Sequence, residues 1–212
     1  MWVTSLTQKI EDWASKTEIV YKIAERYYHE VIRREVVLAD ITKDDHILCI
    51  GGGICPFSAI LLNQASGAKV TVIDNNISCI SKAKKLIKRM GLSKEIKVIY
   101  QDGGSLGFPF SEYTVIHFAL QVCPMEHVFS NIERQAAVGT KLLLRRPKRK
   151  CKQIYSRLAN NLLCDCPLTE HKNACNIGST LLYIKQEGSY EDNALVAGDS
   201  YTPSSCPYPV AI

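Results

Sequence analysis

Residues 47–62 read ILCIGGGICPFSAILL and predict a strand, a turn and a helix in direct succession. The short continuous apolar run that ends at Ile50 is typical of a strand buried on both faces. Gly51 and Gly53 allow the backbone to turn tightly and to approach a ligand without a Cβ atom in the way, and Pro56 suits the first turn of a helix. The stretch therefore predicts a loop that can cradle a nucleotide or a nucleoside.

Acidic residues follow the next two predicted strands. The β-branched run KVTVID (69–74) ends on Asp74, and IKVIY (96–100) is followed by Asp102 and Gly103. An acid roughly twenty residues after the glycines suits the ribose hydroxyls of an adenosine ligand. The carboxylate or the backbone after the third strand could bind the adenine amino group. Three consecutive strand ends thus predict one nucleoside site.

The identity of the nucleoside depends on position 56. A dinucleotide-binding fingerprint has a third glycine there, whereas this chain has Pro56, which offers no N–H to a pyrophosphate at the helix N-terminus. A chain of 212 residues is also too short for the separate substrate domain that most nicotinamide enzymes carry. We therefore expect a ligand without a pyrophosphate, S-adenosylmethionine.

The rest of the chain alternates between strand and helix patterns, which predicts a doubly wound α/β fold with a mostly parallel sheet of six to seven strands. Apolar positions at helical spacing before the first strand predict an amphipathic helix. The expected division is a short N-terminal helical extension (1–40), a ligand-binding α/β domain (41–187) and an irregular C-terminal tail (188–212). The expected elements after the third strand are strands at 113–120, 140–145 and 180–185 and a helix at 125–137.

Composition indicates an ordinary globular protein, with 46% hydrophobic and 22% charged residues. No segment is apolar enough for a membrane span or a signal peptide, so we expect a cytoplasmic protein whose nine cysteines are reduced thiols. The net charge of +5 favours anionic small molecules or weak nucleic-acid contact without requiring either.

The glycine segment GGGICPFSAILL resembles the nicotianamine synthase-like branch of the class I methyltransferase fold, which is Rossmann-like. That branch has Gly-x-Gly-x-x-Pro, then a small hydroxyl residue and an apolar helix, and Gly51, Gly53, Pro56 and Ser58 match this pattern. The resemblance continues through VTVIDNN, KRMGL, VIHFALQV and VFSNIERQAAVGTKLLLRR and covers residues 28 to 185, with a weaker likeness around Tyr28, Glu35 and Leu38.

The resemblance implies an enzyme that binds S-adenosylmethionine and transfers its 3-amino-3-carboxypropyl group to a small-molecule amine or amino-acid-like acceptor. We expect no nucleic-acid or membrane partner and no metal. The expected cofactor-binding residues are Gly51, Gly52, Gly53, Pro56, Asp74, Asn75, Asp102, Gly103, Ala119 and Leu120.

A sulfonium is already an activated electrophile, so the protein needs mainly to hold the acceptor in line and to remove a proton from the amine. The catalytic candidates are Tyr28, Glu35 and His117, and the substrate-binding candidates are Gln121 and Arg145. Each has a structural alternative: helix packing for Tyr28, a solvated helix charge for Glu35, a hydrogen-bonded core residue for His117 and a surface position for Arg145.

Other functions stay open on the sequence. A methyltransferase would use the same site, and a nucleoside-binding protein without catalytic activity would keep it. The basic run RRPKRKCK (145–152) could contact phosphates, although such runs are usually solvated. Cys164, Cys166 and Cys175, with His171 between them, could ligate zinc, but the CxxC spacing of structural zinc sites is missing.

Overall fold

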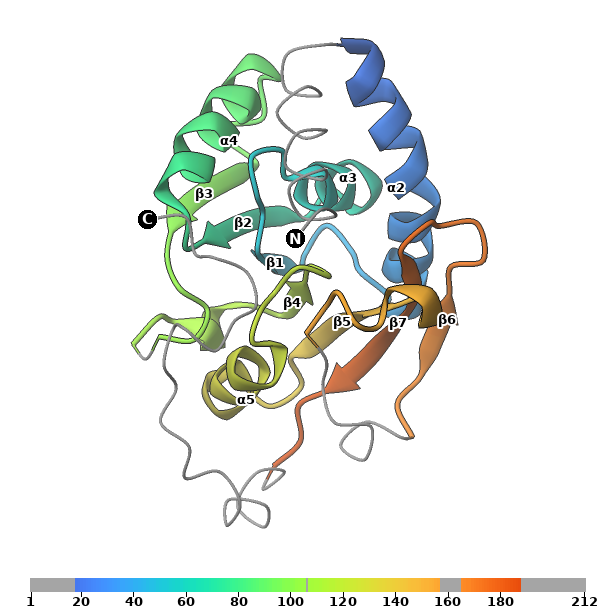
Figure 1. Ribbon diagram of the computed structural model, residues 1–212. Coiled ribbons are helices and arrows are strands. Elements are labelled where there is room, and N and C mark those ends of the chain that lie inside the picture. Colours follow the sequence, from blue (N-terminus) through green and yellow to red (C-terminus); the bar gives the residue numbers. More distant parts are fainter. Residues whose placement is uncertain (1–17, 106, 157–164, 188–212) are drawn as a thin grey trace.

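A computed structural model describes residues 18–105, 107–156 and 165–187. Within them the chain forms one sheet of seven strands in the order β3-β2-β1-β4-β5-β7-β6 (Figure 1). Strands β1 to β5 run parallel, and β7 is antiparallel to both of its neighbours. The strands are β1 His46–Ile50, β2 Lys69–Asp74, β3 Ile96–Tyr100, β4 Val115–Phe118, β5 Lys141–Pro147, β6 Leu168–Glu170 and β7 Ile177–Ile184.

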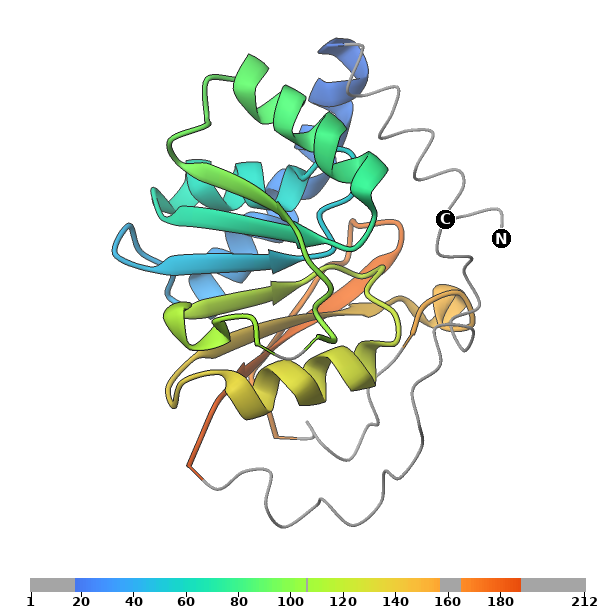
Figure 2. The same cartoon turned by 90° about the vertical axis from the view of Figure 1, so that its left-hand side faces the viewer.

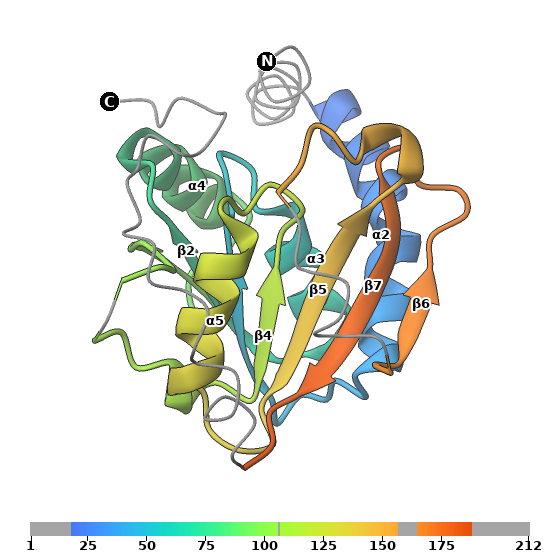
Figure 3. The same cartoon turned by 60° about the horizontal axis from the view of Figure 1, so that its bottom comes forward.

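Helices cover both faces of this sheet. Figure 2 shows α2 (Glu18–Leu38), α3 (Phe57–Ser66) and α4 (Ile77–Arg89) on one side and α5 (Met125–Gln135) on the other. Short 3₁₀ turns at Phe110–Glu112 and Arg149–Cys151 complete the described elements. Figure 3 shows α5 in front of the sheet, with α2 and α3 behind β5 and β7.

The strands bury side chains on both faces, and successive residues of β1 belong to different cores. Cys49 packs with α3 and α4, whereas Leu48 and Ile50 pack with α5. This alternation follows from the two-residue period of a strand. It explains why the sequence of β1 is a continuous apolar run.

The doubly wound fold expected from the sequence is confirmed, and the expected helices and strands lie within a few residues of those observed. Two details differ. The fourth strand is shorter than residues 113–120, and the three-residue strand β6 was not expected, because three residues are too few to show a period. The expected tail at 188–212 lies outside the described residues.

Helix α2 is the described part of the expected N-terminal extension. It packs against α3 and buries Val31, Ile32 and Glu35 completely or nearly so. The division at residue 40 stays a prediction, but the described part of α2 contributes directly to the core of the α/β domain.

The cysteines differ in state. Cys123 is disulfide-bonded, so the expectation that all cysteines are reduced thiols is wrong for this residue. The other described cysteines are not in disulfides: Cys49, Cys55, Cys79, Cys151, Cys166 and Cys175. No helix in residues 18–105, 107–156 and 165–187 has the length and apolar character that a bilayer span needs.

Candidate active site

The glycine loop follows β1 at the point where the strand order reverses between β1 and β4. Gly51 has φ +80° and Gly53 has φ +61°, a left-handed conformation that other residues rarely adopt. Gly52 is required for a different reason, since a Cβ atom there would lie 2.2 Å from Cγ1 of Val72 on β2. The loop can therefore rest directly on the neighbouring strand.

Asp74 ends β2 and holds this loop. Its Oδ2 accepts a hydrogen bond from Gly53 N at 2.8 Å, and its Oδ1 accepts one from Asn76 N at 2.9 Å. Burial raises the pKa of Asp74, although these two backbone donors oppose the rise. Asn75, the next predicted cofactor residue, has an exposed side chain. The structure thus links two of the predicted strand ends through Asp74.

The third predicted strand end lies next to the second, because Gln101 N donates a hydrogen bond to Asp74 O at 3.1 Å. Asp102 Oδ1 accepts a hydrogen bond from Gly104 N at 2.8 Å. Gly103 is buried under α5, where an added Cβ atom would lie 3.0 Å from Val128 Cγ1 and 3.1 Å from Ile50 Cγ2. Close packing is sufficient reason for a glycine at 103.

A pocket lies beside the glycine loop, between the first turn of α3 and the end of β4. It unites many of the predicted residues: Gly51, Gly52, Pro56, Ala119, Gln121, Tyr28, His117 and Arg145. It also contains residues for which no role was predicted: Cys49, Ile50, Cys55, Phe57, Ser58 and Ala59. Leu120 does not line it, because its side chain packs with Val31 and Tyr155 in a separate cluster.

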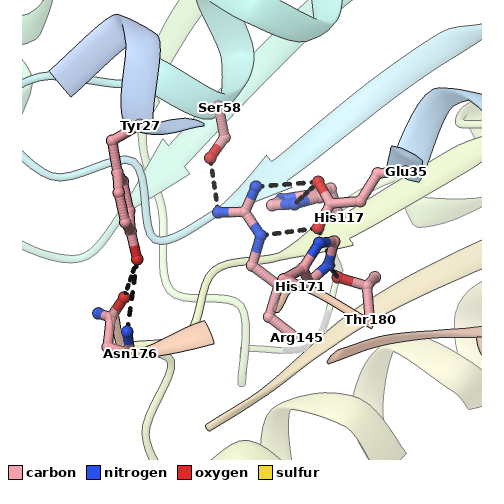
Figure 4. A network of polar contacts seen from close by, with 8 residues as sticks. All are labelled: Tyr27, Glu35, Ser58, His117, Arg145, His171, Asn176 and Thr180. Atoms are coloured by element: carbon pink, nitrogen blue, oxygen red, sulfur yellow. Dashed lines mark hydrogen bonds and ion pairs between the residues drawn. The ribbon is translucent and has the colours of Figure 1, made fainter. Parts of the chain in front are cut away.

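Arg145, which lines this pocket, forms a buried ion pair with Glu35, which does not (Figure 4). Arg145 Nε and Nη2 donate hydrogen bonds to Glu35 Oε1 and Oε2 at 2.8 and 2.9 Å, and Arg145 Nη1 donates one to Ser58 Oγ at 2.9 Å. Glu35 is 0% exposed and Arg145 is 4% exposed. The alternatives of a solvated charge at Glu35 and a surface position at Arg145 are therefore wrong.

The ion pair determines the charge state of both groups. Burial alone would raise the pKa of Glu35, but the Arg145 guanidinium outweighs burial and holds that pKa well below its usual range. Burial likewise opposes the charge on Arg145, and Glu35 outweighs it, so that the pKa of Arg145 is raised. Both groups stay ionised, and Glu35 is consequently a weak proton acceptor.

Two further polar residues extend the pair, and the sequence offered no signal for their position. Thr180 Oγ1 on β7 donates to Glu35 Oε1 at 2.6 Å, and His171 Nε2 lies 2.9 Å from Thr180 Oγ1. Both side chains are buried. Each residue looks ordinary in its own segment, and only strand pairing brings it to Glu35.

His117 on β4 is fully buried and lines the pocket. Its Nε2 lies 3.3 Å from Glu35 Oε2, whereas its Nδ1 has no hydrogen-bond partner among the described residues. His117 is thus a core residue in contact with Glu35, and its catalytic role stays a prediction. Burial, together with the charge of Arg145, lowers the pKa of His117, so the imidazole is neutral.

The two tyrosines of α2 have different surroundings. The Tyr28 ring lies 5.6 Å from the guanidinium carbon of Arg145 and stacks on Phe57 with a centroid distance of 5.8 Å. The Tyr27 hydroxyl lies 2.5 Å from Asn176 Oδ1, outside the pocket lining. Tyr28 therefore belongs to the pocket, whereas Tyr27 connects α2 to the loop between β6 and β7.

Within the described ranges, no cluster of three or more His, Cys, Asp or Glu side chains is arranged to hold a metal ion. The cysteine group considered for zinc is only partly described, because Cys164 lies outside these ranges. Its histidine, His171, contacts Thr180.

No family model matches the chain. A stretch of 72 residues is 26% identical to the L-histidine 2-aminobutanoyltransferase of Yersinia pestis. The stretch makes up 34% of this chain and 27% of that enzyme. The match thus spans just over a quarter of the enzyme's length.

Solved structures match over more of the chain. A variant of the nicotianamine synthase MtNAS, crystallised with S-adenosylmethionine, has a TM-score of 0.71 and 19% identity, covering 86% of this chain and 75% of that one. The structure of MtNAS with MTA and tNA has a TM-score of 0.68 and covers 86% of this chain and 70% of that one. An RNA methyltransferase from Salinibacter ruber, in complex with S-adenosyl-L-homocysteine, has a TM-score of 0.55 and 17% identity. That match covers 74% of this chain and 92% of the RNA methyltransferase. At these identities the likeness establishes the architecture: the chain has the class I S-adenosylmethionine-dependent methyltransferase fold.

Proposed function

We propose that the chain is an S-adenosylmethionine-dependent transferase that moves the 3-amino-3-carboxypropyl group to the amine of a small molecule. The observation that carries the proposal is the pocket itself. It joins the glycine loop after β1 to the neutral imidazole of His117 within the fold of nicotianamine synthase. The crystal complex of MtNAS with S-adenosylmethionine supports the choice of cosubstrate.

The residues present suit this cosubstrate. The left-handed backbone at Gly51 and Gly53 leaves a cradle without side chains, and a Cβ atom on Gly51 would lie 3.3 Å from Val122 Cγ2. Asp74 is the proposed acceptor for the ribose hydroxyls, and the Asp102–Gly103 segment is the proposed adenine contact. These roles rest on the convergence of the strand ends, because the residues that line the pocket do not include Gly53, Asp74, Asn75, Asp102, Gly103 or Leu120.

The sulfonium supplies an activated carbon. The acceptor nitrogen would form a bond to that carbon, while the carbon–sulfur electron pair returns to sulfur and gives methylthioadenosine. The nitrogen must then lose one proton, for which a neutral imidazole is a suitable acceptor. His117 is the proposed base, since its Nδ1 makes no hydrogen bond to a described residue.

The ion pair assigns other roles to the remaining candidates. Glu35 is the proposed counter-ion of Arg145, because its low pKa makes it a poor base. A guanidinium has five N–H groups, and the described contacts of Arg145 use three of them, so Arg145 keeps donors for a carboxylate on the pocket side. Tyr28 and Gln121 would shape the acceptor site.

The acceptor is proposed to be an amine or an amino acid. The partial match to an L-histidine 2-aminobutanoyltransferase supports this class, and L-histidine is the first compound to test. The test incubates the purified protein with S-adenosylmethionine and a panel of amino acids and polyamines, and identifies the nucleoside product by mass spectrometry.

The product distinguishes the alternatives. Methylthioadenosine above an enzyme-free control supports aminocarboxypropyl transfer, and an adduct of matching mass identifies the acceptor. S-adenosylhomocysteine would instead make the chain a methyltransferase. If neither product forms while calorimetry detects bound S-adenosylmethionine, the chain is a nucleoside-binding protein without this activity.

A further inference from the structure

A single chain of hydrogen bonds runs from the hairpin of β6 and β7 to the wall of the pocket. It begins at His171 beyond β6, passes through Thr180 on β7 to Glu35 on α2, and continues to Arg145 on β5 (Figure 4). Its last member is Ser58 in the first turn of α3. Four elements of the fold and the loop after β6 therefore meet in one polar contact path.

The direction of each hydrogen bond in this path is fixed. Glu35 is ionised and can only accept, so the hydroxyl of Thr180 must donate to it. The oxygen of Thr180 then accepts from His171, which places the proton of that imidazole on Nε2. His171 Nδ1 has no hydrogen-bond partner among the described residues, which agrees with this tautomer.

The other half of the path has an equally fixed direction. Arg145 can only donate, and it uses Nε and Nη2 on Glu35 and Nη1 on Ser58. The position of the guanidinium therefore depends on the position of the Glu35 carboxylate. Arg145 and Ser58 both line the pocket, so the path ends on the surface that a ligand would contact.

The hairpin is itself fastened to α2. Tyr27 on α2 contacts Asn176 Oδ1 at 2.5 Å and accepts a hydrogen bond from Cys175 N at 3.0 Å. Arg34 Nη1 donates to Glu170 O at 2.7 Å. These contacts join α2 to the hairpin at two further points, so the hairpin holds Thr180 in a fixed place relative to α2.

We propose that Thr180 and His171 are positioning residues, which fix the Glu35 carboxylate and through it place Arg145 and Ser58 against the substrate. The hairpin thereby controls the geometry of a pocket that its own side chains do not line. As far as it concerns catalysis, this inference rests on the proposed transferase function.

The test compares three substitutions. Thr180→Val keeps the shape of the side chain and removes the hydroxyl, whereas Thr180→Ser keeps the hydroxyl. Thr140→Val is the matched control, because Thr140 is also buried and its hydroxyl donates to Tyr113 O at 3.2 Å, before β5 and away from the pocket. Thr140→Val measures the effect of losing a buried hydroxyl that lies away from the pocket.

Two measurements decide the outcome. The first is the ¹H–¹⁵N resonance of Arg145 Nε, which needs neither ligand nor turnover. We expect Thr180→Val to shift it, and Thr180→Ser and Thr140→Val to leave it near its wild-type position. The second is transfer activity with S-adenosylmethionine, where we expect kcat/KM to fall about 10- to 100-fold in Thr180→Val, as a small misplacement of a positioned group can cause. Thr180→Ser should restore most of this loss.

An Arg145 resonance and a kcat/KM in Thr180→Val equal to those of Thr140→Val would overturn the inference. If Thr180→Val does not fold, His171→Leu and His171→Gln replace it, because glutamine keeps an N–H donor and leucine does not. Equal resonances in that pair would also overturn it. If the wild-type protein shows no turnover, the proposed function fails, while the Arg145 resonance still decides whether the hairpin positions the guanidinium.

Discussion

At the scale of single residues, the buried pair of Glu35 and Arg145 is the most consequential contact of the site. Two charges taken out of water are tolerated only when each has a partner and additional hydrogen bonds. Glu35 has these from Arg145 and Thr180, and Arg145 has a further one to Ser58. Removing one charge leaves the other buried without compensation.

We therefore expect Glu35→Gln to lower the free energy of unfolding by about 3–5 kcal/mol, the usual cost of breaking a buried pair. Urea denaturation followed by circular dichroism measures it. Glu30→Gln is the matched control on the same helix, since Glu30 pairs with Arg33 and Arg34 in a solvent-exposed setting. Equal losses in the two variants would contradict the assignment of Glu35 and Arg145 as a dominant contact.

Asp74 connects the glycine loop to the proposed ribose site. We expect Asp74→Ala to weaken binding of S-adenosylmethionine by about 1–3 kcal/mol, or about 5- to 150-fold in Kd, since a charged acceptor is lost. Calorimetric titration measures this. Asp45→Ala is the control, because Asp45 also accepts a backbone hydrogen bond, from Thr42 N at 2.8 Å, but precedes β1 and so lies at the opposite end of the parallel strands. An unchanged Kd in Asp74→Ala would remove Asp74 from the site.

At the scale of elements, the position of the glycine loop depends on how closely it approaches β2. Gly51 N and Gly52 N both point to Ile73 O, at 2.9 and 3.4 Å, and Val72 occupies the space where a side chain at 52 would lie. The position of the loop thus depends on its contacts with β2 as well as on the backbone conformation of its glycines.

Gly52→Ala should displace the loop from β2 and weaken binding of S-adenosylmethionine, because the new Cβ atom would lie 2.2 Å from Val72 Cγ1. Combining it with Val72→Ala removes the clash and should recover part of the affinity. Val72→Ala alone serves as the reference, since it creates only a cavity, at a cost to stability. If the double variant binds no better than Gly52→Ala, contact with Val72 does not determine the loop position.

At the scale of the whole molecule, two neutral histidines are buried among charged groups. Burial is the main cause of the lowered pKa of both His117 and His171. The unfolded chain takes up protons at these residues as the pH falls through about 6.5, while the folded protein does so only at lower pH. The unfolded state is therefore stabilised relative to the folded state as the pH falls.

The free energy of unfolding should consequently decrease from pH 7 towards pH 5. Below about pH 4.5 it should decrease further, because the lowered pKa of Glu35 adds stability that is lost when its carboxylate is protonated. Urea titrations across this range measure the slope. His171→Gln, which keeps a donor for Thr180 and cannot titrate, should flatten the step near pH 6, with His29→Gln on the exposed face of α2 as the control. A slope unaffected by His171→Gln would contradict this account.

The sequence by itself determined the order of the elements and the loop that follows β1. Glycines at 51 and 53 indicate a left-handed backbone directly. The apolar runs indicate which segments are buried strands, and Asp74 indicates where β2 ends. These features are local, so one segment is enough to recognise them. The proposed roles of the cofactor residues follow from them and stay predictions.

Only the tertiary structure decided which polar residues meet. Glu35 is 110 positions from Arg145 and 145 positions from Thr180, and each would be unremarkable in its own helix or strand. Their contact depends on the pairing of β5 with β7 and on the packing of α2 and α3 against that face of the sheet. Strand pairing and helix packing are long-range properties, because they join segments whose local patterns carry no record of each other. The glycine loop was therefore visible in the sequence. Glu35 and Arg145 could be named as candidates, but their contact with each other and with Thr180 could not be predicted.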